Sequence, residues 1–364
     1  MISRIFSSLA KHIDSFLMAC LLFTLMVGLF VLYSASGQSL ARIYGQSINI
    51  VVALSFMWAA ANIAPNQLER IAMPLYVLGV LLLIAVALFG SISHGARRWL
   101  NLGFTQIQPS EIMRIAMPMM LAWYFAKRED KPTMPDFAIG ALLLLVPVAL
   151  IMKQPDLGTA LLIGASGFYV LFLAGLSWKL LLGGVVAFAA STPILWSMLH
   201  DYQRRRIEIL LDPTQDPLGA GYHTIQAIIA LGSGGTAGKG WLNGTQAQLD
   251  FLPERTTDFI FAVFGEEFGL LGIILLLVLF TFIILRGLVI ASQAQSTFAR
   301  LLAGSITLTF FTYAFVNMGM VSGILPVVGV PLPLISYGGT SMVTLCLSFG
   351  ILMSIHTHKK LVAT

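Results

Sequence analysis

The sequence predicts an all-α integral membrane protein, a polytopic bundle of about ten transmembrane helices with one large extracytoplasmic loop. Hydrophobic residues make up 57% of the 364 residues and charged residues only 10%, whereas a soluble domain carries roughly 25% charged residues. Many apolar runs approach the roughly 20 residues that cross a hydrocarbon core of about 30 Å as a helix. The runs are continuous rather than alternating, so a closed barrel of strands is excluded.

The apolar runs give the order of the predicted helices. They occupy residues 16–34, 46–64, 72–90, 109–126, 136–152, 157–175, 178–199, a long stretch within 258–286, then 301–320 and 338–356. The stretch that starts at 258 is longer than a straight span requires. Gly265 and Gly269 flank a Glu-Glu pair inside it, so we expect a kink or a short half-helix there. We expect residues 1–364 to form a single membrane domain, with its large loop at about 201–257.

Lysine and arginine are distributed unevenly between the two sides of this topology. If the N-terminus is cytoplasmic, the short loops on the far side hold only Arg42, Arg97, Arg98 and Lys153 among the basic residues. An excess of basic residues marks cytoplasmic loops, so we expect both the N- and the C-terminus to be cytoplasmic. The net charge of +5 follows from this asymmetry, and we infer no nucleic-acid partner from it.

Polar residues gather on the outer face of the predicted bundle. Glu111 and Arg114 are three residues apart on a helix and can pair, either as a structural ion pair or beside a water-filled cavity. Asp156 begins a helix, where it can be a simple N-terminal cap. The arginines at 204–206, with Arg205 at the centre, suit lipid headgroups or the recognition of a phosphate or pyrophosphate by arginine's planar fork of donors.

Asp258 lies within FLPERTTDFIFAVFGEEFG, residues 251–269, at the start of the longest apolar stretch. It can cap a helix, but a carboxylate in a partly dry cleft near the headgroups can also have a raised pKa and act as a general base. The glycine-rich GSGGTAGKG at 232–240 misses the spacing of a phosphate loop. No metal-ligand set is visible, so we expect no metal site and no definite cofactor. A divalent cation (Mg or Mn) shared by phosphates and a carboxylate stays open.

These residues alone leave two classes of function open. One is a transporter that uses intramembrane carboxylates as a proton relay. The other is an enzyme that acts on a lipid-linked, phosphate-bearing substrate at the outer leaflet. Composition and topology do not decide between them.

A family resemblance favours the enzyme. The segments QPSEIMRI, KQPDLGTA, RRRIEILLDPTQDPLGAGYHTIQAIIALGSGG, GKGWLNGTQAQLDFLPERTTDFIFAVFGEEFG and GILPVVGVPLPLISYGG together resemble the SEDS family (shape, elongation, division and sporulation) over nearly the whole chain. DPLGAGYH, GTQAQLDFLPE and the short tails are closer to its elongation members than to its division members. The resemblance implies a peptidoglycan glycosyltransferase that polymerises lipid II at the outer face of the bacterial cytoplasmic (inner) membrane, in cell elongation and rod-shape maintenance.

The resemblance also implies site residues and partners. Asp258 matches the essential catalytic Asp of the family, and Glu111 and Asp156 match polar positions that line the family's central cavity. The candidates to neutralise the departing pyrophosphate are Arg98, Arg114, Lys153 and Arg205. The implied partners are lipid II and a polyprenyl-diphosphate-linked glycan, a class B penicillin-binding transpeptidase, and the elongation proteins MreC, MreD and MreB.

Two departures from the family pattern and two rival functions accompany this resemblance. Thr256 stands where the motif often has His, and Arg114 stands where it often has Lys. The rivals are a lipid II flippase and a non-catalytic scaffold for the transpeptidase. A flippase is expected to carry polar residues along the full depth of a pathway, whereas here they cluster on one side, which favours the polymerase.

Overall fold

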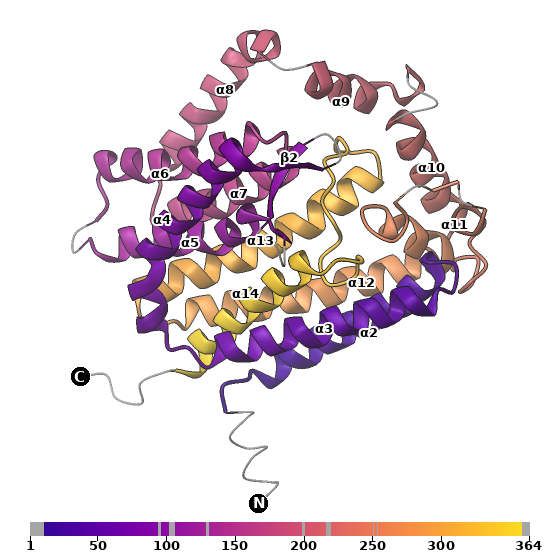
Figure 1. Cartoon of the computed structure of the whole chain (residues 1–364), viewed down its shortest axis with the longest axis horizontal. Helices are drawn as coiled ribbons and strands as arrows, with labels where there is room; N and C mark the ends of the chain where they lie inside the picture. Colours follow the sequence, from indigo (N-terminus) through magenta and orange to yellow (C-terminus); the bar gives the residue numbers. More distant parts are fainter. Residues whose placement is uncertain are drawn as a thin grey trace, which may run out of the picture.

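The computed structural model describes residues 11–93, 96–101, 106–128, 131–198, 201–215, 220–249, 251–252 and 254–358, and long helices dominate it (Figure 1). The long helices are α2 (Ser15–Ala35), α3 (Leu40–Ala61), α4 (Pro65–Phe89), α5 (Pro109–Ala126), α6 (Met134–Met152), α7 (Leu157–Leu173), α8 (Trp178–Met198), α12 (Ile260–Ser292), α13 (Thr297–Val321) and α14 (Thr340–Thr357). Within the described residues, seven of these helices are long and apolar enough to cross a membrane: α2, α3, α4, α6, α12, α13 and α14. The helical, multi-pass membrane fold is confirmed, while the number of about ten spans stays a prediction.

Three short strands between α4 and α5 were not expected from the sequence. β1 (Ser91–Ser93) pairs antiparallel with β2 (Ala96–Asn101), and β2 pairs antiparallel with β3 (Gln106–Ile107). Strands this short contain too few residues to show a recognisable alternation of apolar and polar side chains. Their importance is positional, because β2 carries Arg98.

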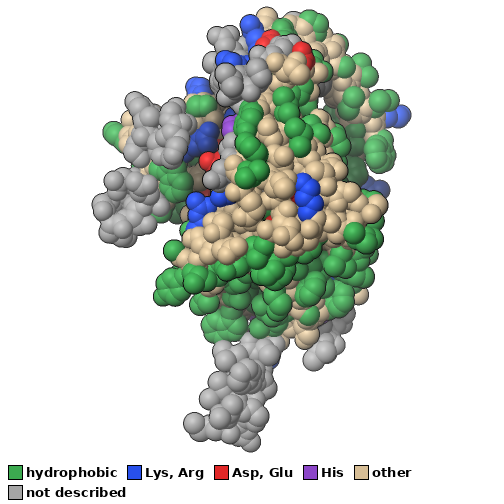
Figure 2. Space-filling view, turned by 90° about the vertical axis from the view of Figure 1, so that its right-hand side faces the viewer, with side chains coloured by type: hydrophobic (Ala, Val, Ile, Leu, Met, Phe, Trp, Pro, Cys, Tyr) green, Lys and Arg blue, Asp and Glu red, His purple; other side chains and the backbone are tan. Residues whose placement is uncertain are grey.

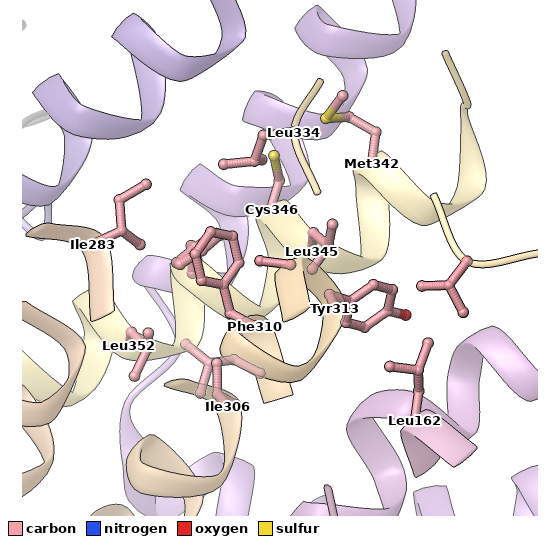
Figure 3. Packing of buried hydrophobic residues seen from close by; sticks show 14 of the residues in the cluster. Leu162, Ile283, Ile306, Phe310, Tyr313, Leu334, Met342, Leu345, Cys346 and Leu352 are labelled. Atoms are coloured by element: carbon pink, nitrogen blue, oxygen red, sulfur yellow. The ribbon is translucent and has the colours of Figure 1, made fainter. Parts of the chain in front are cut away.

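The core of the bundle forms around α13, which packs against α12, α7 and α5. Figure 3 shows Phe310 and Tyr313 of α13 packed beside Leu345 of α14. On its other side α14 approaches α3 so closely that a Cβ on Gly350 would lie 2.2 Å from the carbonyl oxygen of Met57. Small residues permit such close helix packing inside a membrane, where apolar burial alone gives helices little reason to associate.

Both ends of the described chain meet on one face, which we call the terminal face. The rings of His12 and His358 stack with centroids 4.1 Å apart. Asp14, which caps α2, forms an ion pair with Arg286 in the last third of α12, with Oδ2 and Nη2 2.5 Å apart. The meeting of the two ends agrees with an even number of crossings.

The face away from both chain ends, which we call the loop face, carries the segment predicted as a large loop. This segment contains α9 (Asp201–Leu211), the 3₁₀ turn η1 (Pro213–Gln215), α10 (Ala220–Ser233) and α11 (Thr245–Gln248) (Figure 1). Figure 2 shows hydrophobic side chains covering the lower half of the molecule, with the charged side chains lying above them. On the face shown in Figure 2, the described charged side chains therefore lie towards the loop face.

Candidate active site

Helix α12 is broken near its N-terminal end, at the loop face, and this break shapes the site. Gly269 has φ 63° and ψ −162° inside the helix, a left-handed conformation that glycine adopts without the steric strain of a Cβ. The break separates an outer half-helix, residues 260–268, from the longer inner part. The kink or half-helix expected from Gly265 and Gly269 is thus confirmed.

The glycine-rich segment 234–246 covers this break. Four backbone hydrogen bonds join them: Lys239 N–H to Glu266 C=O, Gly240 N–H to Glu267 C=O, Leu270 N–H to Gly235 C=O and Leu271 N–H to Thr236 C=O, each 3.0 Å. They satisfy carbonyls at the end of one half of the helix and amides at the start of the other, which a helix end leaves without partners. The GSGGTAGKG segment therefore caps a broken helix. This role agrees with its sequence, which does not match the spacing of a phosphate loop.

Close approach explains the glycines of this cap. A Cβ on Gly238 would lie 2.1 Å from the carbonyl oxygen of Glu267, and one on Gly269 would lie 2.3 Å from the amide nitrogen of Gly238. Gly235, Gly238 and Gly240 also have positive φ. These contacts leave room for glycine alone without displacement of the backbone.

Asp258 lies in the turn just before the outer half-helix. The side chain of Asn317, fully buried in α13, donates from Nδ2 to the Asp258 carbonyl at 2.8 Å and to the Val330 carbonyl at 2.7 Å. A Cβ on Gly329 would lie 3.5 Å from Oδ2 of Asp258. Burial and the nearby Glu254 raise the pKa of the Asp258 carboxyl to about 6.

The segment 322–339, between α13 and α14, holds the turn that bears Asp258. Tyr337 N–H donates to the Thr256 carbonyl at 2.8 Å, and the Ser336 hydroxyl donates to the Thr257 carbonyl at 2.6 Å. Arg42 of α3 donates to the Thr256 hydroxyl at 3.0 Å. Thr256, which stands where the family motif often has His, is therefore a hydrogen-bond partner of a cation.

Asp156 caps a helix, as its sequence position allowed, and it also contacts a cation. It caps α7 by accepting from Thr159 N–H at 3.2 Å. Its Oδ2 also lies 3.8 Å from Nε of Arg98 and accepts from Gln108 at 3.3 Å. The carboxylate therefore orients a cation that β2 brings to the loop face.

Glu111 and Arg114 form the ion pair expected from their spacing. Their side chains are 11% and 10% exposed, and Oε2 and Nη1 are 2.7 Å apart. The Thr344 hydroxyl of α14 donates to Glu111 at 3.0 Å, and Arg114 donates to the hydroxyl of Ser341 at 3.2 Å. A pair this dry is stable only with such additional hydrogen bonds.

One loop segment lies against both the turn of Asp258 and the turn that follows Asp156. A Cβ on Gly158, in the turn after Asp156, would lie 2.6 Å from the carbonyl oxygen of Val328, so the turn packs on the segment that also contacts Asp258. Arg114 approaches the same turn, with Nη2 3.5 Å from the hydroxyl of Thr159. Segment 322–339 thus lies against the turns of both Asp258 and Asp156, while Glu111 and Arg114 contact Ser341 in the first turn of α14.

The contacts described above do not join Lys153 or Arg205, two of the predicted site cations, to this group of residues. Lys153 is exposed at the C-terminal cap of α6, and Arg205 is exposed on α9. The neighbouring Arg204 donates to the carbonyls of Trp196 and Ser197, so it ends α8 rather than facing Asp258. Among the described residues, no group of three or more His, Cys, Asp or Glu side chains is placed to hold a metal ion.

Three polar residues that the sequence analysis left without a role contribute to the site. Arg42 and Asn317 contact the turn of Asp258, as described above, and Glu266 is fully buried at the broken helix. Polar side chains inside apolar spans are costly and mark functional or structural positions. That rule singles out Asn317 and Glu266, but it does not reveal their partners.

Comparisons with known proteins agree with this architecture. The model of the FtsW/RodA/SpoVE cell cycle proteins matches residues 14–361. Peptidoglycan glycosyltransferase MrdB of Escherichia coli (strain K12) is 52% identical over 353 residues, which cover 97% of this chain and 95% of that protein. A probable peptidoglycan glycosyltransferase FtsW of Geobacter metallireducens is 37% identical over 347 residues, 92% of each protein.

Solved structures share the fold. A chain from a peptidoglycan synthase complex that coordinates polymerization and crosslinking superposes with a TM-score of 0.83 at 31% identity, covering 95% of this chain and 99% of that chain. The rod shape determining protein RodA of Thermus thermophilus superposes with a TM-score of 0.71 at 27% identity, covering 95% and 98%. The chain belongs to the FtsW/RodA/SpoVE family, the SEDS family whose motifs its sequence resembles.

Proposed function

We propose that this chain is a peptidoglycan glycosyltransferase that polymerises lipid II into glycan strands at the outer face of the bacterial cytoplasmic membrane, in cell elongation and rod-shape maintenance. The observation that carries the proposal is Asp258, a half-buried carboxylate with a pKa of about 6 at the outer end of a broken helix. The names of its relatives, peptidoglycan glycosyltransferases of the MrdB and FtsW types, support the reaction class.

Asp258 is suited to act as the general base. The 4-hydroxyl of a lipid II sugar attacks the anomeric carbon of the polyprenyl-linked glycan, and Asp258 accepts the hydroxyl proton. The bond between that carbon and the pyrophosphate breaks, polyprenyl diphosphate leaves, and the α-linkage becomes a β-linkage by inversion. A carboxyl with this pKa is about 90% ionised at pH 7, and a positioned base contributes about 10²–10⁴-fold to the rate.

The departing pyrophosphate requires positive charge at the moment the bond breaks. Arg98 is the best placed, because its side chain is 36% exposed and is only loosely paired with Asp156 at 3.8 Å. Arg114 is buried and its charge is balanced by Glu111, so we assign this pair to positioning the wall of the site. Lys153 and Arg205 are exposed and suit a more distant contact with phosphates.

The same family membership supports partners and a location. We propose that the protein lies in the bacterial inner membrane with both termini in the cytoplasm. We also propose that it works with a class B penicillin-binding transpeptidase and with MreC, MreD and MreB. The similarity to a chain of a synthase complex that coordinates polymerization and crosslinking supports the transpeptidase.

Polymerisation of labelled lipid II by the purified protein, with and without a transpeptidase partner, tests the reaction. Asp258→Asn is compared with wild type, and Asp136→Asn is the matched control. Asp136 begins α6 at the end opposite Asp156 and pairs with Arg128. Glycan strands from wild type and from the control, but none from a folded Asp258→Asn protein, are expected.

Three other outcomes would assign a different role to Asp258 or a different function to the protein. Equal polymer from wild type and Asp258→Asn removes Asp258 from the chemistry. No polymer from wild type with its partner, together with movement of lipid II across vesicle membranes, identifies a flippase instead. Full cellular function of Asp258→Asn with intact partner binding identifies a scaffold.

A further inference from the structure

The outer half-helix of α12 is held at both ends by different segments. At the Asp258 end, segment 322–339 and Asn317 hold the backbone of the turn. At the other end, segment 234–246 supplies the hydrogen bonds across the break at Gly269. The direction of the half-helix therefore depends on the contacts at its two ends, which we call its two anchors.

Glu266 is the centre of the second anchor. Its side chain is 0% exposed, and Oε1 lies 2.8 Å from Nζ of Lys239. The hydroxyl of Thr245 donates to the same oxygen at 3.0 Å, and Gln246 N–H lies 3.1 Å from it and 3.2 Å from Oε2. A Cβ on Gly244 would lie 3.0 Å from Oε2, so the segment is wrapped closely around this carboxylate.

These contacts lead us to propose that Glu266 is a positioning residue for the reaction: through Lys239, Thr245 and Gln246 it fixes the direction of the half-helix that presents Asp258. The proposal rests on the glycosyltransferase function proposed above. Glu266 does not touch the reacting atoms in this role. It acts through the orientation of the half-helix.

The geometry of the half-helix gives the expected size of the effect on the reaction rate. Asp258 precedes Glu266 by eight residues, which corresponds to about 12 Å at a helical rise of 1.5 Å per residue. A tilt of about 5° at Glu266 then displaces Asp258 by about 1 Å, and a misplacement of about 1 Å can reduce a rate about 10²-fold. A looser half-helix also admits water to Asp258, which lowers the pKa of a carboxyl that burial had raised.

The decisive experiment compares Glu266→Gln with Asp14→Asn in the full-length protein. Asp14 forms a buried ion pair with Arg286 at the opposite end of the same helix, so its loss is an equivalent lesion far from Asp258. We expect Glu266→Gln to reduce kcat at least about tenfold, with KM for lipid II nearly unchanged and the acid limb of the pH–rate profile shifted below 6. We expect Asp14→Asn to lower the melting temperature but to keep the wild-type kcat and pH profile.

A second variant keeps the test informative if the Glu266→Gln protein does not fold. Lys239→Met removes the cation, whose side chain is 28% exposed, and retains the hydrogen bonds of Glu266 with Thr245 and Gln246. A folded Lys239→Met protein with a reduced kcat and a lowered acid limb supports the proposal. Wild-type values of both in Lys239→Met or Glu266→Gln overturn it, and an inactive wild type overturns the glycosyltransferase function instead.

Discussion

Replacing Asp258 with Asn is expected to stabilise the folded protein at neutral pH while it removes activity. The pKa of Asp258 is raised from 3.8 to about 6, first by burial and then by Glu254. The folded state therefore disfavours the ionised carboxylate relative to the unfolded chain. Asn retains the shape of the side chain and carries no charge to bury.

The sign and the size of this effect follow from proton linkage. A carboxyl whose pKa is higher in the folded state binds more protons there, so stability falls as the pH rises from 3.8 through 6. At 1.36 kcal/mol per pH unit, the difference between the two pKa values gives a destabilisation of up to about 3 kcal/mol above pH 6. Below pH 3.8 both states are protonated and the effect disappears.

Thermal unfolding of the two proteins in detergent between pH 4 and pH 8 measures the effect. The Asp258→Asn protein is expected to melt several degrees above wild type at pH 7.5, with the gap closing towards pH 4. Asp136→Asn, which loses an ion pair with Arg128, is expected to show no such gain. An Asp258→Asn protein that melts below wild type at pH 7.5 would show that Asp258 is a structural cap, and it would refute the reasoning.

Three further substitutions test other parts of the site. Glu254→Gln is expected to move the acid limb of the pH–rate profile below 6, because it removes a charge that raises the pKa of Asp258; an unmoved limb contradicts this cause. Glu111→Gln is expected to reduce the unfolding free energy by about 3–5 kcal/mol, since it leaves the charge of Arg114 buried alone, and adding Arg114→Met is expected to recover most of the loss in denaturation experiments. Gly269→Ala is expected to reduce the unfolding free energy by at least about 1–2 kcal/mol, because its φ is 63°; a melting temperature equal to wild type would contradict it.

Local patterns allowed parts of the site to be predicted. The Glu111–Arg114 pair follows from two residues three apart on one helix, and the cap at Asp156 follows from its place before an apolar run. The break in α12 follows from Gly265 and Gly269 around two carboxylates in a stretch too long for one span. Each of these features depends on neighbours within a turn or two of the chain.

The other contacts depend on tertiary structure and could not be predicted from local pattern. Lys239 meets Glu266 across 27 positions of sequence, and Arg42 meets Thr256 across 214. Nothing in the composition around Lys239 indicates which carboxylate it will bind. For the same reason Arg98 and Arg205 were equal candidates by sequence, and the fold alone places Arg98 beside Asp156.

The backbone pairing between segment 234–246 and the break in α12 has an evolutionary consequence. The four hydrogen bonds run from consecutive residues on each side, Gly235 and Thr236 with Leu270 and Leu271, and Lys239 and Gly240 with Glu266 and Glu267. An insertion or deletion of one residue in either segment would shift this register and misalign the bonds. Surface loops usually tolerate changes in length, but this one should diverge among descendants of the protein by substitution, with its length inherited together with that of the helix it closes.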